Sequence, residues 1–369
     1  MPGMLDYIKW RGDLDFKALP LNVVDAMIFC ELSYWDLGLS VNDGLRRPAV
    51  TIGAFCEQAM SLPLPEHCIE DSFEFGRLLI ESKRFSSLPL LAFENIVDND
   101  RGKQFAAYTV SLGKKSHFIA IRGTDHSLVG WKENLMLSYN EEVPAQKAAV
   151  EYISRIASAT AGTLYIGGHS KGGNLAVYGA TFSSPKIRSR IKSVFNFDGP
   201  GFNEKVTAKN PFRELVGRIF TYVPQDSIIG LLLEHKEPYT VVQSNKSGME
   251  QHNLFSWEVG PSDVVREQGL SNKSRIGQEN ISEWLERMTY EEKEQFIETL
   301  FALIKEYETI DNLFDVKNIL PLIKAFSEME KEKRRSVADV IGHLKDTVID
   351  NIKERFEKKK MEPYKKGSR

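Results

Sequence analysis

A short glycine-rich segment, Gly168-His169-Ser170-Lys171-Gly172-Gly173, constrains the fold more than any other part of this 369-residue chain. It directly follows a strand pattern from Thr163 to Ile166 and precedes a helical pattern over residues 172–180. The pattern G-x-S-x-G at such a junction is typical of a tight strand-to-helix turn that presents a serine hydroxyl above a sheet. We expect Gly168 and Gly172 to be required there, because a Cβ atom would obstruct the approach of strand, turn and helix.

The region around this segment alternates between strand and helix patterns. A strand, turn and strand are predicted on either side of residues 98–102, and a further strand follows, which indicates a β meander. Pro144 marks the first turn of a predicted helix. Later strands alternate with helices, which favours a mostly parallel sheet covered on both faces. The predicted strands are Phe93–Val97, Phe105–Leu112, Phe118–Ile121, Thr163–Ile166, Ser193–Phe197, Arg218–Val223 and Tyr239–Gln243.

The chain is predicted to contain an α/β domain over residues 1–265, of which residues 1–90 form a helical, cap-like region. Residues 266–281 are rich in Gly, Ser and Asn and are interpreted as a linker. Residues 282–369 show helical periodicity with two capping boxes and are predicted to form a C-terminal helical segment.

Composition narrows the class of protein. Hydrophobic residues make up 42% and charged residues 27%, which is ordinary for a soluble globular chain. A net charge of −3 argues against nucleic-acid binding. We expect no signal peptide or transmembrane segment. Three cysteines without a C-x-x-C pair predict neither a disulfide framework nor a zinc site, and favour a reducing, cytoplasmic location.

A serine nucleophile requires a base, since the hydroxyl is unreactive until an imidazole accepts its proton. In α/β-hydrolases the chain order is Ser, then Asp or Glu, then His, so the base lies after Ser170. Three histidines do: His235, His252 and His343. We favour His252, because it follows the last predicted strand across a loop. His235 is the alternative, and His343 falls within a late helical pattern.

Two aspartates are candidates for the acid that orients the histidine. Asp226 follows the strand ending at Val223, and Asp198 follows the strand ending at Phe197. Both stand at carboxyl ends of strands, where open α/β sheets bind ligands. We favour Asp226, which occupies the usual position of the acid. The competing interpretation of Asp198 is a turn residue that stabilises the Gly199-Pro200-Gly201 loop.

An oxyanion hole needs two amide donors. The amide of Lys171 stands at the start of the predicted helix and is one candidate. Thr124 is the other, because Arg122-Gly123-Thr124 follows the strand ending at Ile121. This chemistry requires neither a metal nor a cofactor.

Several of these segments resemble class 3 (fungal-type) lipases over about residues 91–260: Ile121-Arg122-Gly123-Thr124, Trp131 with Asn134-Leu135, and Gly167 to Gly173. Nearly the whole chain resembles the bacterial, lipase-like Mbeg1-like family, through Asp6–Trp10, Leu21–Trp35, Asn196–Phe202 and Gln251–Trp257. The resemblance implies an α/β-hydrolase fold, a triad of Ser170, Asp226 and His252, and an oxyanion hole formed by Thr124 and the Lys171 amide. Lys171 replaces the Leu usual in class 3 lipases, which predicts a less apolar mouth to the site.

These observations predict a serine hydrolase that cleaves small-molecule or lipid carboxylic esters, with thioesters and amides left open. Phe202 and Leu231–Leu233 are either acyl-pocket or core residues. The alternative hypothesis is a weakly active or inactive scaffold that binds a protein partner through its C-terminal helices. A lipid-surface enzyme would need an exposed lid, for which the helix through Val23, Met27 and Ile28 is a candidate, although burial against the sheet is favoured.

Overall fold

The computed structural model describes residues 2–35, 50–61, 70–125 and 127–275, together with positions 278, 289–291, 293–294, 297–298 and 301. The chain forms two compact units, Met1–Met288 and Thr289–Arg369. Most of the predicted C-terminal helical segment, including His343, lies outside the described residues, so that part of the domain assignment stays a prediction.

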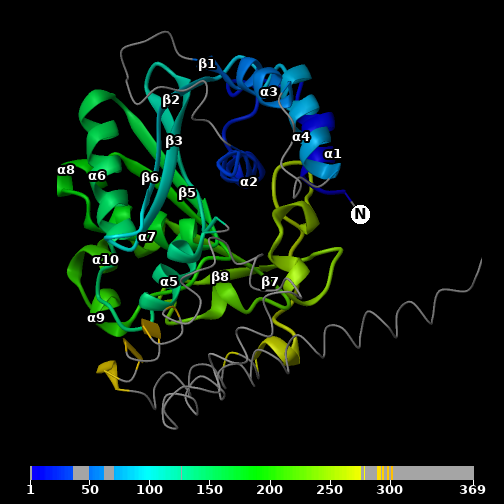
Figure 1. Ribbon diagram of the computed structural model, residues 1–369. Coiled ribbons are helices and arrows are strands. Elements are labelled where there is room, and N and C mark those ends of the chain that lie inside the picture. The colour runs from blue at the N-terminus through cyan, green and yellow to red at the C-terminus, as the bar shows by residue number, and fades with distance from the viewer. Residues whose placement is uncertain are drawn as a thin grey trace, which may run out of the picture. The chain divides into compact units, whose positions relative to one another are not determined.

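A single mixed sheet forms the centre of the first unit (Figure 1). In the described part of the chain its strands lie side by side in sequence order. The first four pair antiparallel, and from β4 to β8 each pair is parallel. The meander and the parallel half are therefore confirmed. The strands are β1 (Val50–Thr51), β2 (Pro89–Asp98), β3 (Lys103–Gly113), β4 (Ser116–Ile121), β5 (Thr163–His169), β6 (Ile191–Phe197), β7 (Ile219–Pro224) and β8 (Tyr239–Val242).

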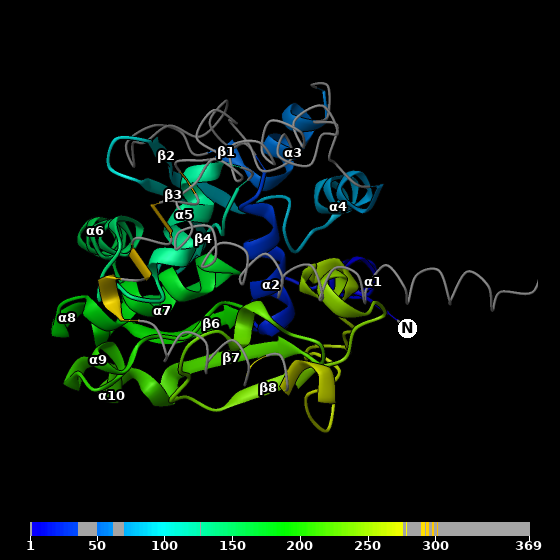
Figure 2. The same ribbon diagram turned by 60° about the horizontal axis from the view of Figure 1, so that its bottom comes forward.

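Helices cover both faces of this sheet, as expected for an α/β-hydrolase fold. One face packs against α6 (Pro144–Ala159) and α7 (Lys171–Phe182), and the other against α2 (Val23–Leu32). Figures 1 and 2 show α1 (Met4–Arg11), α3 (Ile52–Met60) and α4 (Glu70–Glu81) beyond α2. The other helices given for the described residues are α5 (Leu128–Met136), α8 (Pro185–Arg188), α9 (Glu204–Thr207) and α10 (Asn210–Leu215), with 3-10 turns η2 (Val216–Arg218), η3 (Ile229–Leu231), η4 (Gly248–His252) and η5 (Leu254–Ser256).

Helix α2 is a core element and not an exposed lid. Its N-cap Asn22 accepts the backbone N–H groups of Val24 and Asp25, which starts the helix. Apolar side chains then occur around the whole circumference of α2. A helix of this kind is stable only when other elements enclose it. Met27 and Ile28 are completely buried. The favoured interpretation of this segment, burial against the sheet, is thus the one that the structure shows.

A buried ion pair joins the N-terminal helices. Arg84 donates to both carboxylate oxygens of Asp25, with an Nε–Oδ1 distance of 2.7 Å, and both side chains are fully buried. The same guanidinium donates to the carbonyls of Leu14 and Leu19, and Tyr7 donates to Asp25. These bonds tie α1, α2 and the loop between them to the segment that leads into β2.

Residues beyond 265 remain attached to the α/β unit. The amide of Glu267 donates to Val241, at the edge of β8, over 2.9 Å. Further along, Ser271 donates to Gln225, and the Ser274 hydroxyl donates to Ser227. The first part of the predicted linker, up to residue 275, therefore packs against the sheet and closes its β8 edge.

Candidate active site

Ser170 lies at a strained turn between β5 and α7. Its backbone has φ 57° and ψ −135°, a region that residues with a Cβ rarely occupy. A Cβ at Gly168 would stand 2.1 Å from the carbonyl oxygen of Gly172, and one at Gly172 would stand 2.2 Å from that of Ile121. The predicted need for both glycines is confirmed. This geometry is that of a nucleophile elbow, in which the strain presents the serine at the carboxyl edge of the sheet.

His252 forms a hydrogen-bonded pair with Asp198 at the same edge. The distance from Nδ1 to Asp198 Oδ2 is 2.6 Å, and the Asp198 side chain is 1% exposed while that of His252 is 24% exposed. Asp198 directly follows β6 and has a φ of 50°. Its other oxygen accepts the Ser227 hydroxyl at 2.5 Å. The carboxylate is therefore fixed on both sides.

Asp226, the favoured acid, has no hydrogen bond to His252 in the described part of the chain. Its carboxylate accepts the Gly248 amide at 2.9 Å, and its own amide donates to the Gln251 side chain at 2.8 Å. These bonds anchor the loop that carries His252. The predicted contact between Asp226 and His252 is therefore not found in the described part of the chain. The turn after β6, where Asp198 has a φ of 50°, places the Asp198 carboxylate on the imidazole instead. The alternative acid, Asp198, is the one that the fold pairs with His252.

Asp198 is not needed to hold the Gly199-Pro200-Gly201 loop. The Asn196 side chain accepts the Gly199 amide at 3.0 Å, and Asn174 on α7 donates to the carbonyls of Pro200 and Gly201. The two asparagines supply the turn-stabilising bonds, so the Asp198 carboxylate remains available to the imidazole.

His235, the alternative base, is buried elsewhere. Its Nδ1 lies 2.7 Å from Glu237 Oε1, before the start of β8. Glu237 also accepts the Thr221 hydroxyl. Neither of these partners belongs to the edge that carries Ser170.

The imidazole of His252 lies beside the elbow. Its ring centroid is 4.5 Å from that of His169, the residue before Ser170. Among the described residues, no partner is found for the Ser170 hydroxyl or for His252 Nε2. Catalytic hydrogen bonds are often long or poorly aligned before a substrate binds, so the missing bond does not by itself exclude the pair.

His169 has a role that sequence reasoning missed. Its Nε2 lies 2.7 Å from the His252 carbonyl oxygen, and its Nδ1 lies 2.9 Å from the Tyr34 hydroxyl. Because a carbonyl only accepts, Nε2 carries the proton and Nδ1 accepts from Tyr34. Burial, with His252 close by, lowers the pKa of His169 well below its usual range, so the ring is neutral. This side chain holds the backbone of His252, and only its place beside Ser170 hinted at such a contact.

The loop of Thr124 packs directly against the elbow. A Cβ at Gly123 would lie 2.3 Å from the Tyr34 hydroxyl and 2.6 Å from the His169 carbonyl oxygen, so only glycine allows this approach. The Thr124 hydroxyl is bonded to the Asn134 side chain on α5, at 2.7 Å from Nδ2. The described residues contain no acceptor for the amides of Thr124 and Lys171, which leaves both donors open.

The Lys171 side chain turns into the protein and away from the mouth of the site. Its Nζ lies 2.9 Å from Glu133 Oε2, and both side chains are fully buried. It also donates to the backbone oxygen of Gln104 at 2.9 Å. Burial lowers the pKa of Lys171, and the nearby Glu133 opposes that shift. The expectation that this lysine makes the mouth less apolar is therefore wrong, since it is part of the core.

The candidate acyl-pocket residues differ in how deeply they are buried. Phe202 is 3% exposed and packs in the core on the α6 and α7 side of the sheet, and Leu231 is 1% exposed within a small cluster around β7 and β8. Leu232 and Leu233 are half-buried. For the first two, core packing is the better interpretation.

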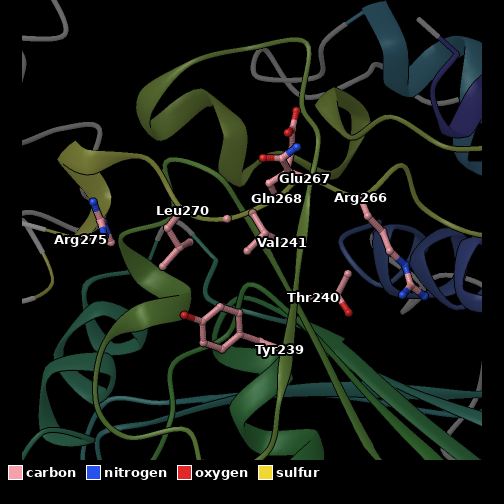
Figure 3. Close-up of a pocket in the computed structure, with 9 residues that line it drawn as sticks. Tyr239, Thr240, Val241, Arg266, Glu267, Gln268, Leu270 and Arg275 are labelled. Atoms are coloured by element: carbon pink, nitrogen blue, oxygen red, sulfur yellow. The ribbon is translucent and has the colours of Figure 1, made fainter.

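A separate hollow of about 540 Å³ lies along β8, between Tyr239 and Arg275 (Figure 3). Glu267 and Leu270 also line it, and none of the residues around the elbow does. Within the described ranges, no group of three or more metal-ligating side chains occurs. No helix of the described part is long and apolar enough to cross a membrane.

The mixed sheet with helices on both faces, and the strained serine between β5 and α7, define a protein of the α/β-hydrolase fold class. The model of the Mbeg1-like family matches residues 79–302. This match covers more than half of the chain, and the protein therefore belongs to the Mbeg1-like family, as its sequence resemblance predicted.

Solved structures give weaker similarity. The chain is similar to M37 lipase, with 15% identity over 56% of this chain and 68% of that chain, at a TM-score of 0.36. It is also similar to the Rhizomucor miehei lipase propeptide complex, with 12% identity over 69% of this chain and 76% of that chain, at a TM-score of 0.38. No curated protein matches the sequence.

Proposed function

We propose that this protein is a serine hydrolase that cleaves carboxylic esters through an acyl-enzyme intermediate. The observation that carries the proposal is the 2.6 Å bond between His252 and the buried Asp198, formed at the sheet edge where the strained turn presents Ser170. A buried carboxylate on Nδ1 fixes the tautomer in which Nε2 is free to accept a proton. Such a combination is what activation of a serine requires.

In the proposed reaction, Ser170 Oγ attacks the acyl carbon while His252 Nε2 accepts the hydroxyl proton. Asp198 stabilises the resulting imidazolium, which then returns the proton to the leaving alcohol. Water, deprotonated by the same imidazole, attacks the acyl-serine and releases the acid. The amides of Thr124 and Lys171 stabilise the negative oxygen of both tetrahedral intermediates.

The choice of esters follows the sequence resemblance to lipases. Thioesters and amides pass through the same intermediates, so hydrolysis rates for the three classes of substrate must be compared to choose between them. Asp226 is assigned to anchoring the His252 loop, and Asp198 replaces it as the proposed acid.

Fluorophosphonate labelling tests this proposal. We expect rapid labelling of the full chain, loss of labelling in Ser170→Ala, and a strong decrease in His252→Ala. Ser183→Ala is the matched control, since Ser183 is a buried serine at the end of the same helix, α7, and donates only to Gly179. A parallel series of 4-nitrophenyl esters from acetyl to palmitoyl measures the preferred acyl length. A folded protein that neither labels nor turns over any ester would contradict the proposal and favour the interaction scaffold.

A further inference from the structure

A buried polar network lies beneath the proposed oxyanion hole. Lys171 Nζ donates to Gln104 Oε1 at 2.5 Å and to Glu133 at 2.9 Å. The other Glu133 oxygen accepts the amide of Ala145, at the start of α6, over 2.7 Å. Gln104, Glu133 and Lys171 are each buried to 1% exposure or less. The network therefore connects the elbow to β3, α5 and α6 without solvent between them.

Gln104 extends this network to the loop of Thr124. Its Nε2 donates to the carbonyl oxygen of Gly123 at 3.3 Å. That carbonyl and the amide N–H of Thr124 belong to the same peptide group. Because a trans peptide is planar and its C=O and N–H point in opposite directions, a bond that fixes the carbonyl also fixes the direction of the amide.

Further hydrogen bonds hold the side-chain amide of Gln104 in one orientation. Its Oε1 is held by Lys171, and its backbone amide donates to Glu133 at 3.2 Å. Oε1 accepts from the Lys171 ammonium group, so only Nε2 can donate to the Gly123 carbonyl. The two bonds together fix the orientation of the side-chain amide. On the other side of the same loop, the Tyr34 hydroxyl packs against Gly123, where a Cβ would stand 2.3 Å from it.

We infer that Gln104, held by Lys171 and Glu133, is a positioning residue that orients the Thr124 amide toward the oxyanion. The inference rests on the proposed hydrolase function and deepens it. Gln104 does not touch the substrate and acts through the Gly123–Thr124 peptide. Lys171 then serves the oxyanion hole twice, with its backbone N–H as a donor and with its side chain as the support of the second donor.

The test compares an ester with its thiono analogue in the full chain. An oxyanion hole stabilises a negative oxygen through donors at 2.7–3.1 Å, whereas sulfur is a weak acceptor. A misoriented Thr124 amide should therefore slow the oxo-ester far more than the thiono-ester. Gln104→Met keeps the length of the side chain and removes both bonding atoms. We expect kcat for 4-nitrophenyl butyrate to fall roughly 10- to 100-fold with KM within about twofold, and the oxo/thiono rate ratio to fall by a similar factor.

Gln146→Met is the matched control. Gln146 is a buried glutamine whose Nε2 donates to Asn174 at 2.8 Å, with no bond to the Thr124 loop. It should lose stability comparably and leave the oxo/thiono ratio unchanged. If Gln104→Met does not fold, Gln104→Asn, which retracts the amide from Gly123 by one methylene, gives the same ratio test.

The outcomes separate the two proposals. A natural protein that neither labels with fluorophosphonate nor turns over esters overturns the proposed function and this inference with it. An active natural protein whose ratio is unchanged in the Gln104 variant, or changes equally in Gln146→Met, overturns the inference alone.

Discussion

Asp198 and Asp226 show how a small difference in position changes what an aspartate bonds to. Both follow neighbouring parallel strands, and both are within reach of the loop that carries His252. Asp198 bonds to the imidazole, whereas Asp226 bonds to the backbone of Gly248. In the proposed mechanism the first contact orients the base, and the second fixes the shape of the loop.

Substitution of each aspartate should separate these roles. In Asp198→Asn, the amide no longer stabilises the imidazolium or fixes the tautomer, and we expect kcat to fall by about 10⁴-fold with little change in KM. In Asp226→Asn, we expect a loss of stability of about 1 kcal/mol and a change in kcat of less than about tenfold. Steady-state ester hydrolysis and urea unfolding measure the two. A larger kcat loss in Asp226→Asn would restore Asp226 as the acid.

His169 allows a second prediction at this scale. His169→Phe keeps an aromatic ring but removes the donor to the His252 carbonyl, which leaves a partly buried acceptor unsatisfied. We expect a loss of about 1–3 kcal/mol in the free energy of unfolding and a lower kcat, because the base is less well placed. His169→Gln, which retains an N–H donor, should recover part of kcat. Equal kcat values in both variants would show that the donor does not matter.

At the scale of elements, the arrangement of the N-terminal helices depends on charge as well as on apolar packing. Helix α2 is enclosed between the sheet and the helices beyond it (Figure 2). A helix so apolar has no polar stripe to set its orientation, and the pair of Asp25 with Arg84 supplies a directional contact.

Breaking that pair should destabilise the protein strongly. Arg84→Met leaves the Asp25 carboxylate buried without its partner, and we expect a loss of about 3–5 kcal/mol. Arg77→Met is the control, because Arg77 pairs with Glu74 while its side chain is 43% exposed, and such pairs contribute about 1 kcal/mol or less. Denaturant unfolding measures both. The double variant Asp25→Leu with Arg84→Met should recover much of the loss, and its failure to do so would assign the effect to packing.

At the scale of the whole molecule, the pH dependence of the free energy of unfolding is the sum of contributions from all titratable groups. The contribution of Glu31 can be measured separately by substituting this residue. Burial raises the pKa of Glu31, at the end of α2, to about 7. The folded state therefore keeps a proton at pH values where the unfolded state has lost it. The stability of the fold falls as the pH rises from the unfolded pKa of about 4.5 to about 7, and is constant above that.

Glu31→Gln should remove this contribution. Since the side chain is half-buried, we expect the variant to be more stable than the natural protein by about 1–3 kcal/mol at pH 8, with no difference below about pH 4.5. Thermal unfolding from pH 4 to pH 9 measures the difference between the two proteins. A difference that is the same at all pH values would show that the carboxyl is not the cause.

Local patterns were sufficient to predict most of the sheet. The strand ending at Ile121 and the one beginning at Thr163 are found where the alternation and turn residues indicate, and Pro144 begins α6. These features depend on neighbours within a few residues, so the sequence contains the information directly. The elbow was predictable for the same reason, since Gly168 and Gly172 meet atoms only a few positions away or on the adjacent strand.

The sequence by itself determined most of the strands and the serine turn, because each follows from local pattern. Chain order favoured His252 as the base, and that role stays a prediction. Only the tertiary structure decided which aspartate meets His252, because that depends on the order of strands in the sheet and on the turn after β6. It also decided that the Lys171 side chain is buried against Glu133, a residue 38 positions away. Contacts between residues so far apart are set by the packing of whole elements, and no local pattern specifies them.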